Sequence, residues 1–537
     1  MNFSKKFSSF FHKNKSNKSK KNISNIETKY RSNGSNGELR TLDITFSDDS
    51  FVTTPSEPTF VNSPTKTKKL DDAPKCPTCD GNLTSWDYRN GALYNFWCNT
   101  CESKSLQENF VNWTSGNKDI DKLIHDSQLN IGYNMSYLEW IPFDRIENLQ
   151  EIGKGGFATV YSATWVDGPR GQWNNETKNW DRCGPRKVAV KWFHNSANIS
   201  TEFLNELKLH SRYFRDSYIL QYFGISLYPS TGDLLLILQF ANMGNLRNYI
   251  QSNPKLPWTQ KLDILESIVI GLSQLHYNAN LIHKDFHPGN ILLSNLGFLG
   301  CEPIIMTSIS DFGLTKPPNY SEKQQPSSPN QDNQQKPSKN SQHHLSLTSL
   351  PPIYGVMPYV APEALQGHPF SKKSDIFSLA MIMWELSSGK LPFADRPHDY
   401  NLFLDICRGI RPDIVPGTPK CFVDLMKSCW ISNEFDRPTT QIVVHTVLTW
   451  IKEVNKTKFG DIYDQFKEAD DEMMKLDKKR KDSFDMVASS SSVAASSSSS
   501  SSPLPSSSAI SSSQGIAIHP NAIYTSRLLN KFTKYII

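Results

Sequence analysis

The chain has 537 residues, of which 37% are hydrophobic, so it is long enough and apolar enough to form a sizeable core. This composition excludes a chain that is disordered throughout. The formal net charge of +5 is small for this length and does not indicate a dedicated nucleic-acid-binding protein.

No apolar run approaches the ~20 residues that a membrane-spanning helix needs, and the lysine-rich N-terminus has no apolar signal core. Of nine cysteines, four form two close pairs and five are scattered, which is typical of a reducing compartment rather than of a disulfide framework. We therefore expect an intracellular, cytoplasmic protein without a transmembrane segment.

Residues 1–70 are rich in Ser, Asn, Lys and Thr and have few aliphatic side chains, a composition that predicts a disordered basic region. Within this region, Phe3, Phe7, Phe10 and Phe11 fall at helical spacing among lysines. That pattern would suit a basic amphipathic helix on an anionic surface. A solvated tail that holds a few aromatic residues is the preferred interpretation.

Two cysteine pairs follow, in the segments CPTC and CNTC. Their spacing, C-x2-C-x18-C-x2-C, is that of four-thiolate zinc ribbons, because two residues between thiols allow a turn that directs both sulfurs to one ion. So short a segment has almost no core without a metal. A redox pair and unmetallated thiols are the less favoured alternatives. We assign a zinc module to residues 74–103 and a connecting helical segment to 104–145, and we expect the ligands to be Cys76, Cys79, Cys98 and Cys101.

The next patterned stretch, EIGKGGFATVYSATW, carries a glycine cluster between two apolar, β-branched segments. This pattern predicts two strands joined by a turn whose backbone can approach a phosphate closely. The strand RKVAVKWF follows, with Lys191 at its apolar centre, where a buried ammonium needs an anion such as a phosphate or a glutamate. The helical segment TEFLNELKLHSRY supplies the candidate partner Glu206, with Glu202 one turn away as the alternative.

Two further segments, HKDFHPGN and ISDFGLTK, contain the residue types that phosphoryl transfer requires. One carboxylate orients the attacking hydroxyl, and a second carboxylate with an amide oxygen holds Mg²⁺ against the phosphates. Asp285, Asn290 and Asp311 are the candidates for these roles. Each alone would more often be a loop or capping residue, but their order after the glycine cluster and the lysine is not expected by chance.

At this point the chain resembles the eukaryotic protein kinases, over residues 146–454. The match continues in MPYVAPEAL, KSDIFSLAMIMWEL and NEFDRPT, in a style similar to the tyrosine-kinase-like group. With the cysteine pairs, NWTSGN, LEWIPFDRIENL and the tail HPNAIYTSRLL, it resembles an expanded family of fungal kinases. The resemblance implies an α+β, two-lobed protein kinase fold, with a β-rich N-lobe over residues 146–241 and a helical C-lobe over residues 242–454.

The resemblance also implies roles for single residues. Asp375 would brace the catalytic loop from a buried helix, and Glu363 would pair with Arg437. Leu238 would be the gatekeeper of the hinge, where residues 239–241 would offer backbone groups to adenine. The implied catalytic residues are Asp285, Lys191 and His287, the implied Mg²⁺ ligands are Asn290 and Asp311, and the implied ATP-binding residues are Ile152, Gly153, Gly155, Gly156, Val160, Ala189, Lys191, Glu206, Leu238, Gln239, Phe240, Ala241, Asn290, Leu292 and Asp311.

Four positions depart from the family's pattern. Ala158 replaces the third glycine of the phosphate loop. Lys284 replaces an arginine before the catalytic aspartate, so it would meet a phosphorylated activation loop as a point charge rather than with a two-pronged fork. His287 and Val356 replace the lysine and threonine usual in serine/threonine kinases. We expect His287 to donate to the γ-phosphate, with a space-filling role beside Val356 as the alternative.

Two insertions interrupt the kinase-like region. The segment between Ala163 and Val188 predicts a surface hairpin, with Trp173 and Trp180 as packing anchors. The Pro/Gln/Ser/Asn-rich insert in the activation segment, at about 317–347, is too polar to pack and is expected to be disordered.

After the kinase-like region, residues 455–484 predict a charged helix, residues 485–513 a Ser-rich linker, and residues 514–537 a tail motif. The apolar seam of the helix covers only two heptads, fewer than a coiled coil needs. Docking on its own kinase domain is therefore preferred over dimerisation. The seam consists of Ile462, Phe466, Ala469, Met473 and Leu476.

Together these patterns predict a protein kinase that transfers the γ-phosphate of ATP to a protein hydroxyl, of serine or threonine rather than tyrosine. Its expected cofactors are ATP, Mg²⁺ and Zn²⁺. The alternative is a pseudokinase scaffold or adaptor that acts through its zinc module and tails, against which the intact lysine, asparagine and aspartates argue. We expect a protein substrate, a protein partner for the zinc module, no nucleic acid and a monomeric chain.

Overall fold

The computed structural model of residues 1–537 describes residues 74–131, 137–197, 218–295, 305–311, 353–475 and 518–533, except 77, 84, 90–91, 156–157, 175–176 and 178, and also 199, 203–204 and 207–208. The regions expected to be disordered, 1–70, 317–347 and 485–513, lie outside the described residues. The chain from Cys76 onward forms one compact unit. Within the described ranges, no helix has the length and apolar character needed to cross a membrane.

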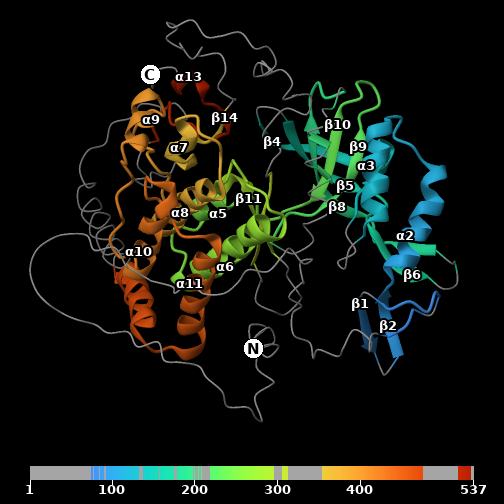
Figure 1. Ribbon diagram of the computed structural model, residues 1–537, viewed down its shortest axis with the longest axis horizontal. Coiled ribbons are helices and arrows are strands. Elements are labelled where there is room, and N and C mark those ends of the chain that lie inside the picture. Colours follow the sequence, from blue (N-terminus) through green and yellow to red (C-terminus); the bar gives the residue numbers. More distant parts are fainter. Residues whose placement is uncertain are drawn as a thin grey trace, which may run out of the picture. The chain divides into compact units, whose positions relative to one another are not determined.

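A six-stranded sheet with the strand order β3-β9-β10-β8-β5-β4 forms the first part of this unit (Figure 1). β3 pairs in parallel with β9, and all other neighbouring strands are antiparallel. Of the glycine cluster, Gly153 lies near the end of β4 and Gly155 follows this strand, on the way to β5. The strands are β3 (Glu139–Trp140), β4 (Ile146–Lys154), β5 (Ala158–Trp165), β8 (Arg186–Phe193), β9 (Tyr222–Leu227) and β10 (Leu234–Gln239).

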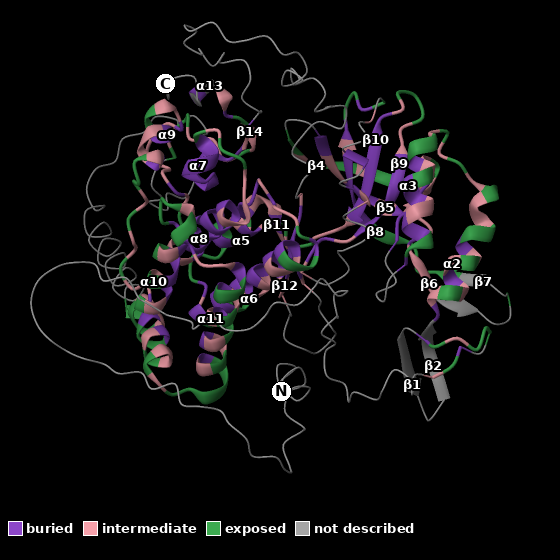
Figure 2. Cartoon of the chain, viewed as in Figure 1, coloured by how far each residue is buried: buried purple, intermediate pink, exposed green. Residues whose placement is uncertain are grey.

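The central strands are buried on both faces because their apolar runs are nearly continuous (Figure 2). On β8, Val188 and Val190 pack into one hydrophobic cluster, whereas Ala189 packs into a second cluster on the opposite face. Because side chains alternate along a strand, Lys191 lies on the same face as Ala189. The Lys191 side chain therefore lies on the face of the sheet that carries the second cluster.

Helical segments contribute apolar residues to the same cluster as Ala189. α3 (Lys118–Leu129) begins at Asn117, whose side chain accepts hydrogen bonds from the backbone N–H groups of Asp119 and Ile120. α2 (Asn99–Glu108) precedes it. The helical residues that pack into this cluster are Ile120, Leu123, Ile124, Phe203, Leu204 and Leu207.

The insertion between β5 and β8 folds as the hairpin of β6 (Arg170–Asn174) and β7 (Asn179–Arg182), so the expected hairpin is confirmed. Its backbone register pairs Trp173 with Trp180. The side chains of both tryptophans lie outside what the structure describes, so their packing role stays a prediction. Arg170 of the hairpin donates to the buried Glu102 carboxylate of α2 at 3.0 Å.

The second part of the unit is helical (Figure 1). Its centre is α8, which is buried on all sides from Ser374 to Leu386. A capping box between Ser371 and Ser374 begins α8, and Gly389, with a φ of 67°, ends it in the left-handed conformation. The helices are α5 (Leu246–Ser252), α6 (Trp258–Ser273), α7 (Pro362–Leu365), α8 (Lys372–Ser388), α9 (Tyr400–Cys407), α10 (Lys420–Cys429) and α11 (Thr440–Lys452).

Short elements connect these helices and strands. The single-turn helices are η2 (Asn109–Asn112), η3 (Phe143–Arg145), η4 (Gln274–Asn278), η5 (Pro288–Asn290), η8 (Met357–Tyr359), η9 (Glu434–Asp436) and η10 (Glu453–Thr457). Near the end of the chain, β14 (Arg527–Leu528) pairs antiparallel with β13 (Tyr354–Gly355), and α13 (Asn530–Thr533) follows. Residues far apart in the sequence therefore share this small sheet.

Residues 461–475 are helical and dock on the helical part of the same chain, so the preferred docking is confirmed for the described residues. Phe466 is 2% exposed, and its ring centroid lies 5.6 Å from that of Trp258 and 5.8 Å from that of Trp450. Asp470 accepts a hydrogen bond from the Trp258 N–H at 2.9 Å. Leu476, the last residue of the expected seam, lies outside the described residues.

Replacing Phe466 with alanine should destabilise the helical part, because it leaves a cavity among aromatic rings. Large-to-small changes of this kind cost about 3 kcal/mol or more, which corresponds to a melting temperature lower by about 6 °C or more. Met474→Ala is the matched control on the same helix, because Met474 is 61% exposed. Calorimetry that found equal melting temperatures for the two variants would contradict the docking.

Candidate active site

The hairpin of β11 (Ile291–Asn295) and β12 (Ile305–Ile309) brings the asparagine and the second aspartate of the motifs together. Ile291 pairs with Ile309, so Asn290 and Asp311 lie at the same open end of the hairpin. The Asn290 carbonyl accepts hydrogen bonds from the N–H of Ser310 at 2.8 Å and from its hydroxyl at 3.0 Å. Strand register thus fixes the backbone positions of two candidate metal ligands.

Asp285 joins this end through Asn290. The Asn290 side-chain amide donates to the Asp285 carbonyl at 2.9 Å and approaches the Asp285 carboxylate at 3.4 Å. Because the amide nitrogen makes these contacts, the amide oxygen remains as the group that could ligate a cation. Asp285 is 5% exposed, so its carboxylate acts in a largely dehydrated setting.

Lys191 reaches the same site from the sheet. Its ammonium lies 2.7 Å from the Asp311 carboxylate, and the residue is 9% exposed. The partner expected from sequence, Glu206, and the alternative, Glu202, lie outside the described residues. Asp311 has a φ of 61°, a left-handed backbone that side-chain-bearing residues seldom adopt and that is concentrated at functional sites.

Asp375 of α8 holds the loop that carries Asp285. Its buried carboxylate accepts hydrogen bonds from the backbone N–H groups of His283 at 2.7 Å and of Lys284 at 3.1 Å. The His276 ring nitrogen lies 2.9 Å from the same carboxylate. The contacts are those that the family resemblance implies, and they anchor the loop on α8, which is buried from Ser374 to Leu386.

A second buried ion pair supports the helical part. Both terminal nitrogens of Arg437 donate to the Glu363 carboxylate, at 2.8 and 2.7 Å. Burial raises the pKa of Glu363, but the hydrogen bonds and charge of Arg437 outweigh it and hold the pKa below its ordinary value. Glu363 therefore stays ionised, in the pairing that the resemblance implies.

Five of the fifteen residues expected around ATP meet in the cluster on the Lys191 face of the sheet. Gly155 and Ala158 close the turn between β4 and β5 through an N–H to carbonyl hydrogen bond of 2.8 Å. The Gln239 N–H donates to the Gln221 carbonyl, so this N–H is not available to a base. Gly156 lies outside the described residues, and Ile152 is exposed. The expected residues in the cluster are Ala189, Leu238, Val160, Phe240 and Leu292.

His287 lies against the candidate catalytic aspartate. Its Nδ1 accepts a hydrogen bond from the Gly289 N–H at 3.0 Å, so the ring proton belongs on Nε2. Nε2 lies 3.5 Å from the Asp285 carboxylate. Burial raises the pKa of Asp285, but the neighbouring His287 outweighs it, and the pKa stays below its ordinary value.

Ser526 is a site contact that the sequence analysis did not assign. Its side chain lies close enough to the Asp285 carboxylate to help lower the pKa of that group. The only signal in the sequence is the pair of hydroxyl residues in the tail segment YTSRLL, and such pairs are common in loops. In the sequence, the tail motif contributes only to the resemblance to the fungal kinases, and nothing in its residue spacing links it to Asp285.

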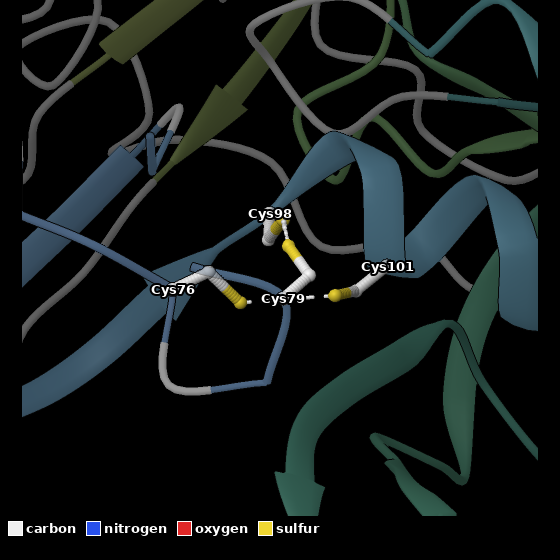
Figure 3. A group of neighbouring side chains, drawn as sticks. All are labelled: Cys76, Cys79, Cys98 and Cys101. Atoms are coloured by element: carbon white, nitrogen blue, oxygen red, sulfur yellow. Dashed lines mark hydrogen bonds between the residues drawn. The ribbon is translucent and has the colours of Figure 1, made fainter. Parts of the chain in front are cut away.

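The four cysteines of the two pairs form a separate cluster, with their sulfurs directed toward one another (Figure 3). All four sulfurs lie within 4.8 Å of one another, with 3.7 Å between Cys76 and Cys101 and 3.5 Å between Cys79 and Cys98. A tetrahedral ion with bonds of about 2.3 Å to sulfur requires edges of about 3.8 Å. The donor set and its spacing therefore fit zinc.

Local backbone geometry builds this cluster. The Cys76 N–H donates to the Gly81 carbonyl at 2.7 Å, and the Thr78 N–H approaches the Cys76 sulfur at 3.4 Å. Cys98 and Cys101 lie at the start of α2. Burial and the neighbouring thiols raise the pKa of Cys101, so four thiolates in this space need a cation. Between the pairs, β1 (Ser85–Arg89) and β2 (Ala92–Trp97) form a hairpin.

Comparison with known proteins agrees with this arrangement. A family model described as protein tyrosine and serine/threonine kinase matches residues 146–447, more than half of the chain. The chain is 27% identical over 318 residues to mitogen-activated protein kinase kinase kinase 7 of Drosophila melanogaster, an alignment that covers 58% of this chain and 38% of that protein.

Two further relatives are receptor-interacting serine/threonine-protein kinases. Kinase 4 of Mus musculus is 28% identical over 304 residues, 54% of this chain and 32% of that protein. Kinase 2 of Bos taurus is 28% identical over 324 residues, 57% of this chain and 51% of that protein. The chain thus spans about a third to a half of the length of these relatives. With the family model matched over most of the sheet and the helical part, the chain belongs to the protein tyrosine and serine/threonine kinase family.

Proposed function

We propose that the chain is a protein kinase that transfers the γ-phosphate of ATP to a protein hydroxyl in a Mg²⁺-dependent reaction. The observation that carries this proposal is the convergence of Lys191, Asp285, Asn290 and Asp311 at the open end of one hairpin. Phosphoryl transfer depends almost entirely on positioning and on electrostatic stabilisation, and these four side chains supply both.

Each residue has a distinct task in this proposal. Asn290 and Asp311 would hold Mg²⁺, which when bound neutralises charge on the phosphate oxygens. Lys191, which has Asp311 as its ion partner, would also contact the phosphates. Asp285 stays ionised because its pKa is low, so it accepts a hydrogen bond from the attacking hydroxyl and orients it.

We propose serine or threonine rather than tyrosine as the acceptor. The receptor-interacting relatives are named serine/threonine-protein kinases, which supports this choice. His287 and Val356 stand where serine/threonine kinases usually have lysine and threonine, so these two positions do not themselves support a serine or threonine acceptor. A pseudokinase scaffold remains the competing function, and it is the one that catalytic turnover would exclude.

Substitution of Asp285 and of Asp311 should impair different steps of the reaction. Asp285→Asn should abolish phosphoryl transfer with little change in the affinity for Mg²⁺ and ATP, because this carboxylate orients the hydroxyl and does not hold the metal. Asp311→Asn should weaken Mg²⁺-dependent ATP binding itself. Calorimetric titration with Mg²⁺ and ATP, with a transfer assay in parallel, separates the two. An equal loss of nucleotide affinity in both variants would contradict the assigned roles.

Substitution of His287 tests its role in transfer. If this residue donates to the transferring phosphate, a donor at this position stabilises the charge that builds on the phosphoryl oxygens. His287→Lys should then retain the rate, and His287→Ala should lower the rate about tenfold. An unchanged rate in His287→Ala would show that the ring only fills space.

We further propose that residues 74–103 form a zinc module that docks a protein, and that its four thiolates hold one Zn²⁺. Distances between sulfurs support the metal. The eight cysteines within the described residues are free thiols, which supports a reducing intracellular compartment. The domain boundaries given above, from the zinc module to the C-terminal tail, are part of the same proposal.

Metal analysis of the purified full chain under reducing conditions tests the module. About one zinc per chain is expected, and Cys98→Ser or Cys101→Ser should reduce it to less than half, because three thiolates bind the ion much more weakly. Cys183→Ser is the control, because Cys183 is an exposed thiol that is not part of the cluster. Equal zinc in all variants, or little zinc in the unaltered chain, would contradict the site.

A further inference from the structure

The tail of the chain is anchored on the helical part by its backbone and by apolar side chains. Leu529 is completely buried and Phe532 is 8% exposed, with its ring 6.4 Å from that of Phe403 in α9. The Tyr524 hydroxyl donates to the Pro392 carbonyl at 2.8 Å. These contacts hold residues 521–532 in one place on the kinase domain.

The anchored segment runs as a strand beside the end of the activation segment. Arg527 pairs with Gly355, and Leu528 pairs with Tyr354. The pairing continues through the Leu529 N–H, which donates to the Ile353 carbonyl at 2.8 Å. Extended peptides commonly bind proteins in this way, by pairing as an added strand with an exposed backbone edge.

The register of this strand places Ser526 at the catalytic aspartate. Gly355, the partner of Arg527, lies so close to Asp285 that a Cβ atom on it would be 3.6 Å from the carboxylate. Ser526 is the residue directly before Arg527, and its side chain lies close enough to the Asp285 carboxylate to help lower the pKa of that group. Strand pairing and side-chain contact therefore agree on the position of this hydroxyl.

Arg247 of α5 holds the tail segment just before Ser526. Its guanidinium donates to the Tyr524 carbonyl at 2.9 Å and lies 5.3 Å from the Tyr524 ring. The same arginine has an ion partner, Glu385, in α8, at 3.4 Å. The residues before and after Ser526 are thus both held by the kinase domain, which is what orientation of a reacting group requires.

We propose that Ser526 is a phosphorylation site that the kinase domain modifies within its own chain. The inference rests on the proposed function. In this step the Ser526 Oγ forms a bond to the γ-phosphorus of ATP, the bond from that phosphorus to the bridging oxygen breaks, and ADP leaves. The hydroxyl proton passes by way of Asp285 to solvent. The tail is in this sense the first substrate of the enzyme.

Phosphorylation would also release the tail. A phosphoserine carries about two negative charges at neutral pH, and it would lie against the ionised Asp285. Like charges in a buried site repel strongly, so the product should leave the aspartate. Until then, the tail occupies the position that an external acceptor needs, and phosphorylation of other proteins should begin after a lag.

The test follows phosphate on the full chain incubated with Mg²⁺ and ATP, by mass spectrometry. Ser526 should be phosphorylated at an initial rate per chain that does not change with protein concentration, as an intramolecular step requires. Ser526→Ala should remove this phosphate, whereas Thr525→Ala, next to it in the exposed turn, should keep it. A rate that rises in proportion to concentration would overturn the intramolecular step.

Release of the tail gives a second measurement. Leu529→Ala should loosen the anchor, slow Ser526 phosphorylation and raise the initial rate on a generic substrate, myelin basic protein, at least threefold. Leu528→Ala is the matched control, because Leu528 is 46% exposed. If myelin basic protein is phosphorylated while Ser526 is not, the inference fails and the proposed function stands. If neither protein is phosphorylated, the proposed function fails as well.

Discussion

The hydrogen bonds from the catalytic loop to Asp375 are the constraint on which the rest of the site depends. This carboxylate is 1% exposed and accepts hydrogen bonds from two backbone N–H groups of the loop, so movement of the loop would cost a buried polar group two of its hydrogen bonds. α8 supplies this carboxylate from within the hydrophobic cluster packed around that helix, where Ile376, Phe377 and Leu379 are buried. The position of Asp285 is therefore set by the packing of a helix and not by the loop itself.

The site also needs residues from two sequence motifs to lie close together, and the β11–β12 hairpin brings them to one place. Asn290 and Asp311 are 21 residues apart in the chain, and antiparallel pairing brings them to one end. Lys191 comes from strand β8 of the sheet, and because side chains alternate along the strand, it lies on the face of the hydrophobic cluster that contains Ala189 and Leu238. The proposed metal site, phosphate contact and hydroxyl site would thus come from three elements, namely the β11–β12 hairpin, strand β8 and the loop that carries Asp285.

Much of this arrangement could be predicted from the sequence. The glycine turn, the lysine strand, the two aspartate motifs and the cysteine spacing each carry a local physical signature. The structure brings Lys191 together with the two aspartate motifs and, in a separate cluster, brings the four cysteines together. Two features had no such signature. Asp311 as the partner of Lys191 depends on tertiary placement, because residues 120 positions apart share no local pattern. The contact of Ser526 with Asp285 depends on a tail that follows a long serine-rich stretch, whose length fixes no position.

The most direct test of the account follows the γ-phosphorus itself. The purified full chain is incubated with a protein mixture, Mg²⁺ and an ATP analogue that carries sulfur on the γ-phosphate, and the thiophosphorylated residues are mapped by mass spectrometry. The account predicts thiophosphate on serine and threonine hydroxyls, and no transfer when Mg²⁺ is removed by a chelator. Nucleotide binding without any transfer to a hydroxyl, or hydrolysis alone, would contradict it and would favour a scaffold.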